Sequence, residues 1–181
     1  MHPRHYSSEG IVLARRNYGE ADRILVVFSK AFGKISLMAK GVRYPKSRKR
    51  GAIEVFSHIK FAAVAGKNLD LITEAEIIDT FNLIRRDLKR ASLAYFFMEA
   101  IGRTLHEGEQ NMEIYKLLIK YLNKLKIEKK LKRLRLDFIL KLLTLEGFWP
   151  KGKPMVNPDS ALQEVTEREM NSVRVGKKLL S

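Results

Sequence analysis

The chain has 181 residues, 45% of them hydrophobic and 9% aromatic, which excludes wholesale disorder and allows one or two domains with a buried core. It contains no cysteine, which excludes disulfides, thiol catalysis and a cysteine-ligated zinc site. Lysine and arginine outnumber aspartate and glutamate by 35 to 20, so the formal net charge is +15. An excess of this size predicts a polyanionic partner, either nucleic acid or an acidic membrane surface.

The first 79 residues read as short strands separated by turns. Turn signals lie at Tyr18–Glu20, Phe32–Lys34 and Ala65–Asn68. Five short strands in so few residues predict a small closed barrel, of which the OB-fold is the commonest form. The expected strands are residues 10–14, 23–28, 34–39, 53–65 and 68–73.

Positive charge is concentrated around the link between the third and fourth expected strands. From Arg23 to Lys67 there are eleven basic residues and one acidic residue, Glu54. Such a stretch predicts a face of constant sign that neutralises phosphates, while an exposed ring stacks on unpaired bases. For Tyr44 we leave open base contact or simple solvation. The expected nucleic-acid contacts in the link are Arg43, Tyr44, Lys46, Arg48, Lys49 and Arg50.

The apolar period becomes helical after about residue 79. We expect one helix over 88–105 ended by Gly108, a second after the cap Asn111, and a third over 128–146 ended by Gly147. These helices predict a bundle, so the chain is an α+β protein with a barrel over 1–79, a helical domain over 80–149 and an extension over 150–181. In the extension, Thr166 and Glu169 fit a capping box that would begin a short helix.

A second basic run extends from Lys124 to Lys141, on the face of the third expected helix opposite its leucines. This run is either a solvated helix face or a surface that attracts the same polyanion at long range. We do not expect it to bind a membrane, because the apolar face of the helix is needed for packing in the bundle. Its central members are Lys126, Lys129, Lys130 and Arg133.

Nothing in the sequence indicates catalysis, a cofactor or a metal. Residues 147–153 match the spacing of a phosphate-binding loop up to its lysine, but Pro154 replaces the required Ser or Thr and the segment follows a helix. No nucleophile is paired with a base. No two of the four histidines have ligand spacing on an expected helix, and His2 and His5 near the N-terminus would bind metal only adventitiously. No stretch reaches the length of a membrane span and no apolar signal core follows the N-terminus, so we expect a cytoplasmic, nucleoid-associated protein that is not an enzyme.

Several motifs together resemble a known family. Tyr18–Leu25 (YGEADRIL), Phe32–Arg43 (FGKISLMAKGVR) and Pro45–Arg48 (PKSR) are similar to the N-terminal domain of the bacterial RecO recombination mediators. Thr73–Glu76, Arg86–Leu88 and the run from Leu142 to Phe148 extend the resemblance, more loosely, into the helices.

The resemblance implies an OB-fold followed by a helical domain without catalytic residues. It implies binding of single- and double-stranded DNA, annealing of complementary strands, and action with RecR to let RecA replace single-stranded-DNA-binding protein, whose C-terminal tail would dock on the bundle. Many relatives carry a four-cysteine zinc module after the position of Gly147, which this chain lacks. Carried onto matching positions, the DNA-contacting residues are Arg23, Lys34, Lys40, Arg43, Lys46 and Arg48.

Two other functions remain open from the sequence. The chain would be a protein-interaction adaptor with incidental DNA binding if the helical domain were its working part. It would be an RNA-binding OB-fold protein if the charge alone determined the ligand.

Overall fold

The computed structural model describes residues 4–166, which form two compact units. The chain up to Thr80 forms the first unit together with a later segment, Leu105–Asn111. Phe81–Thr104 and the described residues from Met112 to Thr166 form the second unit.

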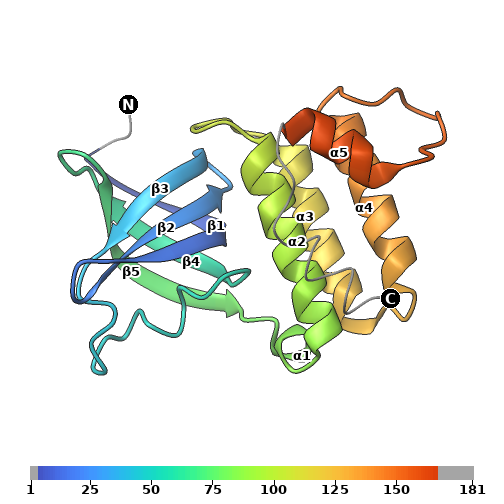
Figure 1. The fold of residues 1–181 in the computed structure, drawn as a ribbon. Coiled ribbons are helices and arrows are strands. Elements are labelled where there is room, and N and C mark those ends of the chain that lie inside the picture. Colours follow the sequence, from blue (N-terminus) through green and yellow to red (C-terminus); the bar gives the residue numbers. More distant parts are fainter. Residues whose placement is uncertain (1–3, 167–181) are drawn as a thin grey trace. The chain divides into compact units, whose positions relative to one another are not determined.

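The first unit is a closed five-stranded barrel, as the sequence predicts (Figure 1). Its strands follow the order β1-β2-β3-β5-β4, the arrangement of an OB-fold, with every pairing antiparallel except that of β3 with β5. The strands are β1 (His5–Tyr18), β2 (Asp22–Ser29), β3 (Gly33–Ala39), β4 (His58–Val64) and β5 (Asp70–Asp79).

The strand prediction is wrong at one place that matters for the site. The run from residue 53 to 65 reads as one strand, but β4 begins only at His58. Ile53 and Val55 lie two residues apart, as in the alternation of a strand, but they belong to a segment without regular secondary structure. The alternation arises because both side chains are buried. The connection between β3 and β4 is therefore longer than expected and covers residues 40–57, which we call the basic loop.

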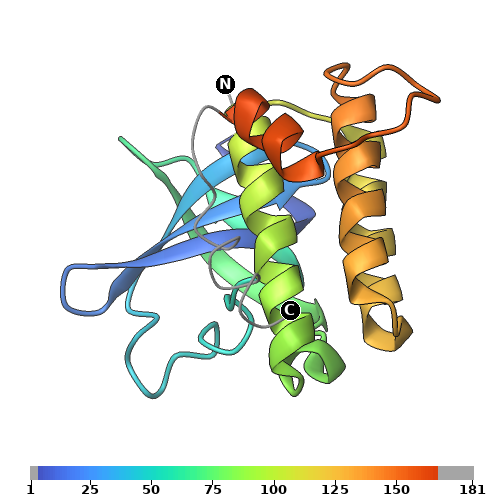
Figure 2. The same ribbon diagram turned by 45° about the vertical axis from the view of Figure 1, so that its right-hand side comes forward.

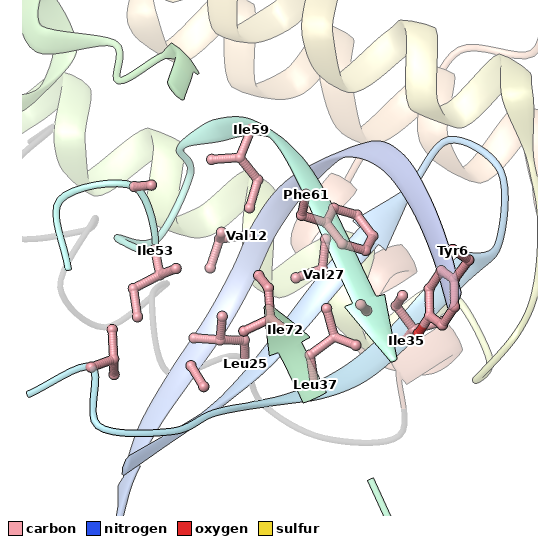
Figure 3. Packing of buried hydrophobic residues seen from close by; sticks show 14 residues of the cluster. Tyr6, Val12, Leu25, Val27, Ile35, Leu37, Ile53, Ile59, Phe61 and Ile72 are labelled. Atoms are coloured by element: carbon pink, nitrogen blue, oxygen red, sulfur yellow. The ribbon is translucent and has the colours of Figure 1, made fainter. Parts of the chain in front are cut away.

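The barrel interior is filled by alternating residues of its strands. Leu25 and Val27 from β2 meet Ile35 and Leu37 from β3, and all four are almost fully buried (Figure 3). Each such side chain contributes about 1.5–3 kcal/mol by leaving water. Ile53 of the basic loop belongs to the same cluster, so part of the loop is barrel core.

The segment Leu105–Asn111 adds to the barrel through the β2–β3 turn and the start of β3. The Gly108 N–H donates to the carbonyl of Lys34 at 2.7 Å, and Glu107 forms an isolated parallel bridge with Lys34. Gln110 donates from Nε2 to the carbonyl of Ala31. The sequence predicts a helix up to residue 105 and a stop at Gly108, whereas the helix ends at Thr104 because the chain leaves it to make these contacts.

The second unit is a helical bundle. The helices α2, α3 and α4 pack against one another around buried aromatic rings, and α5 packs against α2 and α4 (Figures 1 and 2). A short α1, absent from the sequence prediction, precedes them. The helices are α1 (Asn82–Arg85), α2 (Leu88–Thr104), α3 (Met112–Ile127), α4 (Leu131–Leu145) and α5 (Pro158–Thr166).

The limits of α4 and α5 correct two details of the sequence prediction. Helix α4 begins at Leu131 rather than 128. Its end is as expected: Gly147 has a positive φ of 78° and donates to Thr144, while Phe148 donates to Leu143, which is a Schellman motif.

Thr166 does not begin a helix. It is the last residue of α5, and its hydroxyl donates back to the carbonyl of Leu162 at 2.9 Å. Glu169, the other half of the expected capping box, lies outside the described residues. Among residues 4–166, none of the helices is long and apolar enough to span a membrane.

Candidate nucleic-acid interface

The basic loop is anchored to the barrel by apolar residues and backbone hydrogen bonds. Val42 and Ile53 are completely buried, near either end of the loop. The Gly41 N–H donates to Oδ1 of Asp22 at 2.8 Å. These contacts fix the ends of a segment that has no regular secondary structure, so its exposed side chains project from a defined support.

The C-terminal end of the loop is clamped onto β1 at a β-bulge between Val12 and Ala14. Phe56 donates its N–H to the carbonyl of Val12 at 2.8 Å, and Val12 donates to the carbonyl of Ser57 at 3.1 Å. Phe56 has a φ of 55°, an unfavourable backbone conformation for a non-glycine residue that the burial of its ring offsets.

Four of the predicted contact residues and the predicted aromatic ring are exposed to solvent. They lie in the turns of the basic loop, outside the strands of the barrel. Figure 1 shows this loop as the long irregular connection between β3 and β4. Tyr44 exposes 59% of its surface. Charge and an exposed ring together are what a flexible single strand requires of a binding surface. The exposed residues are Lys40, Tyr44, Lys46, Arg48 and Arg50.

Three other predicted contacts use their charged groups within the barrel unit. Lys34 donates from Nζ to the carbonyl of Leu105, and Lys49 donates to the carbonyl of Ile72 at 3.1 Å. Arg43 donates from Nη1 to the carbonyl of Gly19 at 3.1 Å. These side chains hold the loop and the segment Leu105–Asn111 in place, which is a structural role that the sequence does not reveal.

Arg23 lies close to two other arginines, Arg15 and Arg50, and shares the carboxylate of Glu54 with Arg15. Glu54 accepts from Nη2 of Arg15 at 2.9 Å and from Nη1 of Arg23 at 3.4 Å. Burial and the guanidinium of Arg15 lower the pKa of Arg23, and Arg50 acts in the same direction while Glu54 opposes it. Three guanidinium groups near one carboxylate leave an excess of positive charge that favours a further anion.

Two residues at this place are absent from the sequence prediction. Arg15 joins the cluster from β1, opposite Leu25 of β2 in the strand register. Tyr18 is exposed at the β1–β2 turn, the turn that Arg43 contacts through Gly19. The expected strand over residues 10–14 stops just before Arg15, whereas β1 continues to Tyr18 and pairs Asn17 with Arg23.

The helical unit carries the second set of predicted basic residues. Lys129 and Lys130 lie in the turn between α3 and α4, and Arg133 lies in the first turn of α4; all three are exposed. They line one pocket together with Lys89, Leu131 and Lys132. Lys126 lies elsewhere, with its ammonium 4.8 Å from the centre of the Phe81 ring.

The described residues offer no evident place for a metal ion. Across 4–166, no three His, Asp or Glu side chains are grouped as ligands. His58, the most enclosed of the described histidines, lies 3.9 Å from Glu9, and burial lowers its pKa.

Comparison with known proteins agrees with the fold and the motifs. The family model described as "Recombination protein O N terminal" matches residues 1–81, and the one described as "Recombination protein O C terminal" matches residues 85–153. Each covers most of one structural unit.

Curated relatives carry the corresponding name. A protein of Pelotomaculum thermopropionicum named "DNA repair protein RecO" is 36% identical over 145 residues, which is 80% of this chain and 56% of the relative. A protein of the same name from Alkaliphilus metalliredigens is 35% identical to this chain over 144 residues, which is 79% of this chain and 58% of the relative. One from Rubrobacter xylanophilus is 37% identical over 147 residues, which is 81% of this chain and 59% of the relative. In these three comparisons the match spans little more than half of the relative's length. The chain belongs to the RecO family of DNA repair proteins.

Proposed function

We propose that this chain is a DNA-binding recombination mediator that anneals complementary single strands and assists RecA in replacing single-stranded-DNA-binding protein. The observation that carries the proposal is the basic loop, which exposes Lys40, Lys46, Arg48 and Arg50 from an anchored support. Family membership supports DNA as the polyanion. In this proposal no covalent chemistry is performed.

The proposed mechanism is electrostatic. Lysine and arginine side chains replace the counterions of the phosphates, and the released ions provide most of the binding free energy. Two strands whose phosphates are neutralised repel each other less, so complementary bases meet more often. The exposed rings of Tyr18 and Tyr44 would stack on unpaired bases without selecting a sequence.

Annealing of strands coated with single-stranded-DNA-binding protein tests the proposal. The informative variant replaces Lys46, Arg48 and Arg50 by Gln, because these side chains are exposed and do not anchor the loop. Its control replaces Lys30, Lys60 and Lys67 by Gln, which removes the same charge from exposed places elsewhere on the barrel unit. Annealing by the unmodified chain and the control, with loss in the loop variant, is the expected result. Annealing by all three would exclude the loop, and annealing by none would exclude the function.

Family membership also supports RecR and the tail of single-stranded-DNA-binding protein as partners. A titration with a synthetic tail peptide tests the second of them and gives a saturable signal if the adaptor role is present. Parallel titrations with matched DNA and RNA strands separate the proposed function from RNA binding, since DNA binds more tightly if the proposal is right.

A further inference from the structure

The basic pocket of the helical unit is assembled from parts of the chain that are distant in sequence. Lys89 comes from the start of α2, whereas the other lining residues come from the α3–α4 turn and the first turn of α4. The pocket has a volume of about 430 Å³. Its lining consists of five cationic residues and one apolar residue: Lys89, Lys129, Lys130, Leu131, Lys132 and Arg133.

Contacts of Arg90 join the two parts of the chain that line the pocket. Arg90 donates from Nη1 to the carbonyls of Leu125 and Glu128, the second at 2.8 Å, and so ties the start of α2 to the end of α3. Its Nε also lies 3.3 Å from Oδ2 of Asp87. The neighbouring Lys89, whose N–H donates to Oδ1 of Asp87, is thereby placed in the lining of the pocket.

The acidic groups near the pocket are engaged with backbone donors. Oε1 of Glu128 accepts from the N–H groups of Lys129 and Lys130 at 2.8 and 2.9 Å, and the bond from Lys130 is the main cause of its lowered pKa. Oδ1 of Asp87 accepts from the N–H groups of Lys89 and Arg90. Five cations with two nearby carboxylates leave a strong local excess of positive charge.

We propose that this pocket binds the phosphates of a second nucleic-acid strand, separate from the strand bound at the basic loop. The proposal rests on the proposed function, to which it adds a second site. A docked peptide needs a buried apolar or aromatic anchor, but Leu131 is the only apolar residue in the lining. Closely spaced cations suit a chain of phosphates, whose bound counterions they release.

Two sites on different units give the chain a way to hold two strands at once. A strand at the basic loop and a strand at the pocket are both neutralised by one molecule. Annealing then requires no second copy of the protein.

A bridging assay separates the two sites. The pocket variant replaces Lys129, Lys130 and Arg133 by Gln. The control replaces Lys116, Lys120 and Lys151 by Gln, all exposed residues of the same unit outside the pocket. Each protein is mixed with two sets of ten-nucleotide oligothymidine strands, one carrying a fluorescent donor and the other an acceptor. The strands cannot pair with each other, so fluorescence energy transfer between them measures bridging by the protein. The unmodified chain and the control are expected to bridge the strands, and the pocket variant is expected to bridge them much less, because three cations that neutralise phosphates have been removed. Equal bridging by the pocket variant and the control would overturn the proposal.

Amide chemical shifts, measured by NMR during a titration with oligothymidine, test the pocket even when the basic loop no longer binds. In the loop variant of Lys46, Arg48 and Arg50, oligothymidine is expected still to shift the amide signals of 129–133. Shifts confined to the basic loop in the unmodified chain would overturn the pocket and leave the proposed function intact. Shifts confined to 129–133 would support the pocket and remove the loop assignment.

The same signals identify the ligand. Inorganic phosphate and an oligoglutamate peptide of equal charge are titrated beside oligothymidine. The proposal requires the strand to bind at least tenfold more tightly than either. Equal binding of oligoglutamate would assign the pocket to an acidic protein, and equal binding of phosphate would assign it to the free ion, so either result would overturn the proposal.

Discussion

Glu54 forms ion pairs with two of the arginines near the basic loop, Arg15 and Arg23. Its carboxylate holds the guanidinium groups of Arg15 and Arg23, so an incoming phosphate has to compete with it. It is also the single acidic residue between Arg23 and Lys67. If the proposed function is right, Glu54 occupies guanidinium groups that a phosphate would otherwise contact.

Replacing Glu54 by Gln is expected to strengthen the binding of single-stranded DNA severalfold at low salt. The freed guanidinium groups become available to phosphates, and each new contact steepens the log–log salt dependence by about 0.7. Fluorescence anisotropy at several salt concentrations measures both effects. Glu74→Gln on β5 is the control, because it removes the same charge from an exposed position. Equal gains in the two variants would show that only net charge matters.

Tyr121 makes the helical unit sensitive to alkaline pH. Burial, reinforced by the hydrogen bond to Asp137, raises the pKa of Tyr121 from 10.0 to about 12. The folded chain therefore keeps a proton that the unfolded chain loses between these values, so the free energy of unfolding falls as pH rises through this window.

The expected loss is about 2–3 kcal/mol over that range, from 1.36 kcal/mol for each pKa unit. Urea denaturation at pH 9 to 12 measures it. Tyr121→Phe keeps the ring and removes the titration, so it is expected to show a shallower decline. An identical decline in both proteins would contradict this role of Tyr121.

At the level of elements, the β2–β3 turn depends on glycine because the segment Leu105–Asn111 lies against it. Gly33 has a φ of 68°, and a Cβ there would lie 2.2 Å from the carbonyl oxygen of Glu109. Gly19, in the β1–β2 turn, has a φ of 54° but open space around it. A side chain at Gly19 would therefore meet backbone strain alone, whereas a side chain at Gly33 would meet both backbone strain and a steric clash.

Gly33→Ala is therefore expected to destabilise the protein more than Gly19→Ala does. Gly19→Ala adds only the backbone strain of about 1–2 kcal/mol. Gly33→Ala adds the displacement of a backbone segment to the same strain. Chemical denaturation of the two variants compares them, and equal losses of stability would mean that Leu105–Asn111 does not restrain the turn.

The elements also show which features of the fold could be predicted from the sequence. Turn residues and apolar runs are local, so five strands and three helices were predictable. The run from residue 53 to 65 was misread because burial in the barrel core gives Ile53 and Val55 a strand-like alternation. The docking of Leu105–Asn111 depends on contacts with Lys34 some seventy residues away, which no local pattern encodes.

For the whole molecule, the sequence predicts where positive charge is concentrated, but it does not predict which cations are exposed and which form internal hydrogen bonds. The basic loop follows from counting charges along the chain. Lys34 and Lys49 are indistinguishable in sequence from Lys46, yet they donate to the carbonyls of Leu105 and Ile72 whereas Lys46 is exposed. Lys89 joins the basic pocket only because the bundle brings the start of α2 to the α3–α4 turn.

Salt dependence gives the most direct test of the central claim that the exposed cations of the basic loop bind nucleic-acid phosphates. Binding of a fluorescent oligothymidine is measured at increasing salt for the unmodified chain, the loop variant of Lys46, Arg48 and Arg50, and the control variant of Lys30, Lys60 and Lys67. With three phosphate contacts removed, the slope of log affinity against log salt should be shallower by about 2 in the loop variant. The control should keep the slope of the unmodified chain. Equal slopes for the loop variant and the control would contradict the account, because the phosphates would then be bound elsewhere.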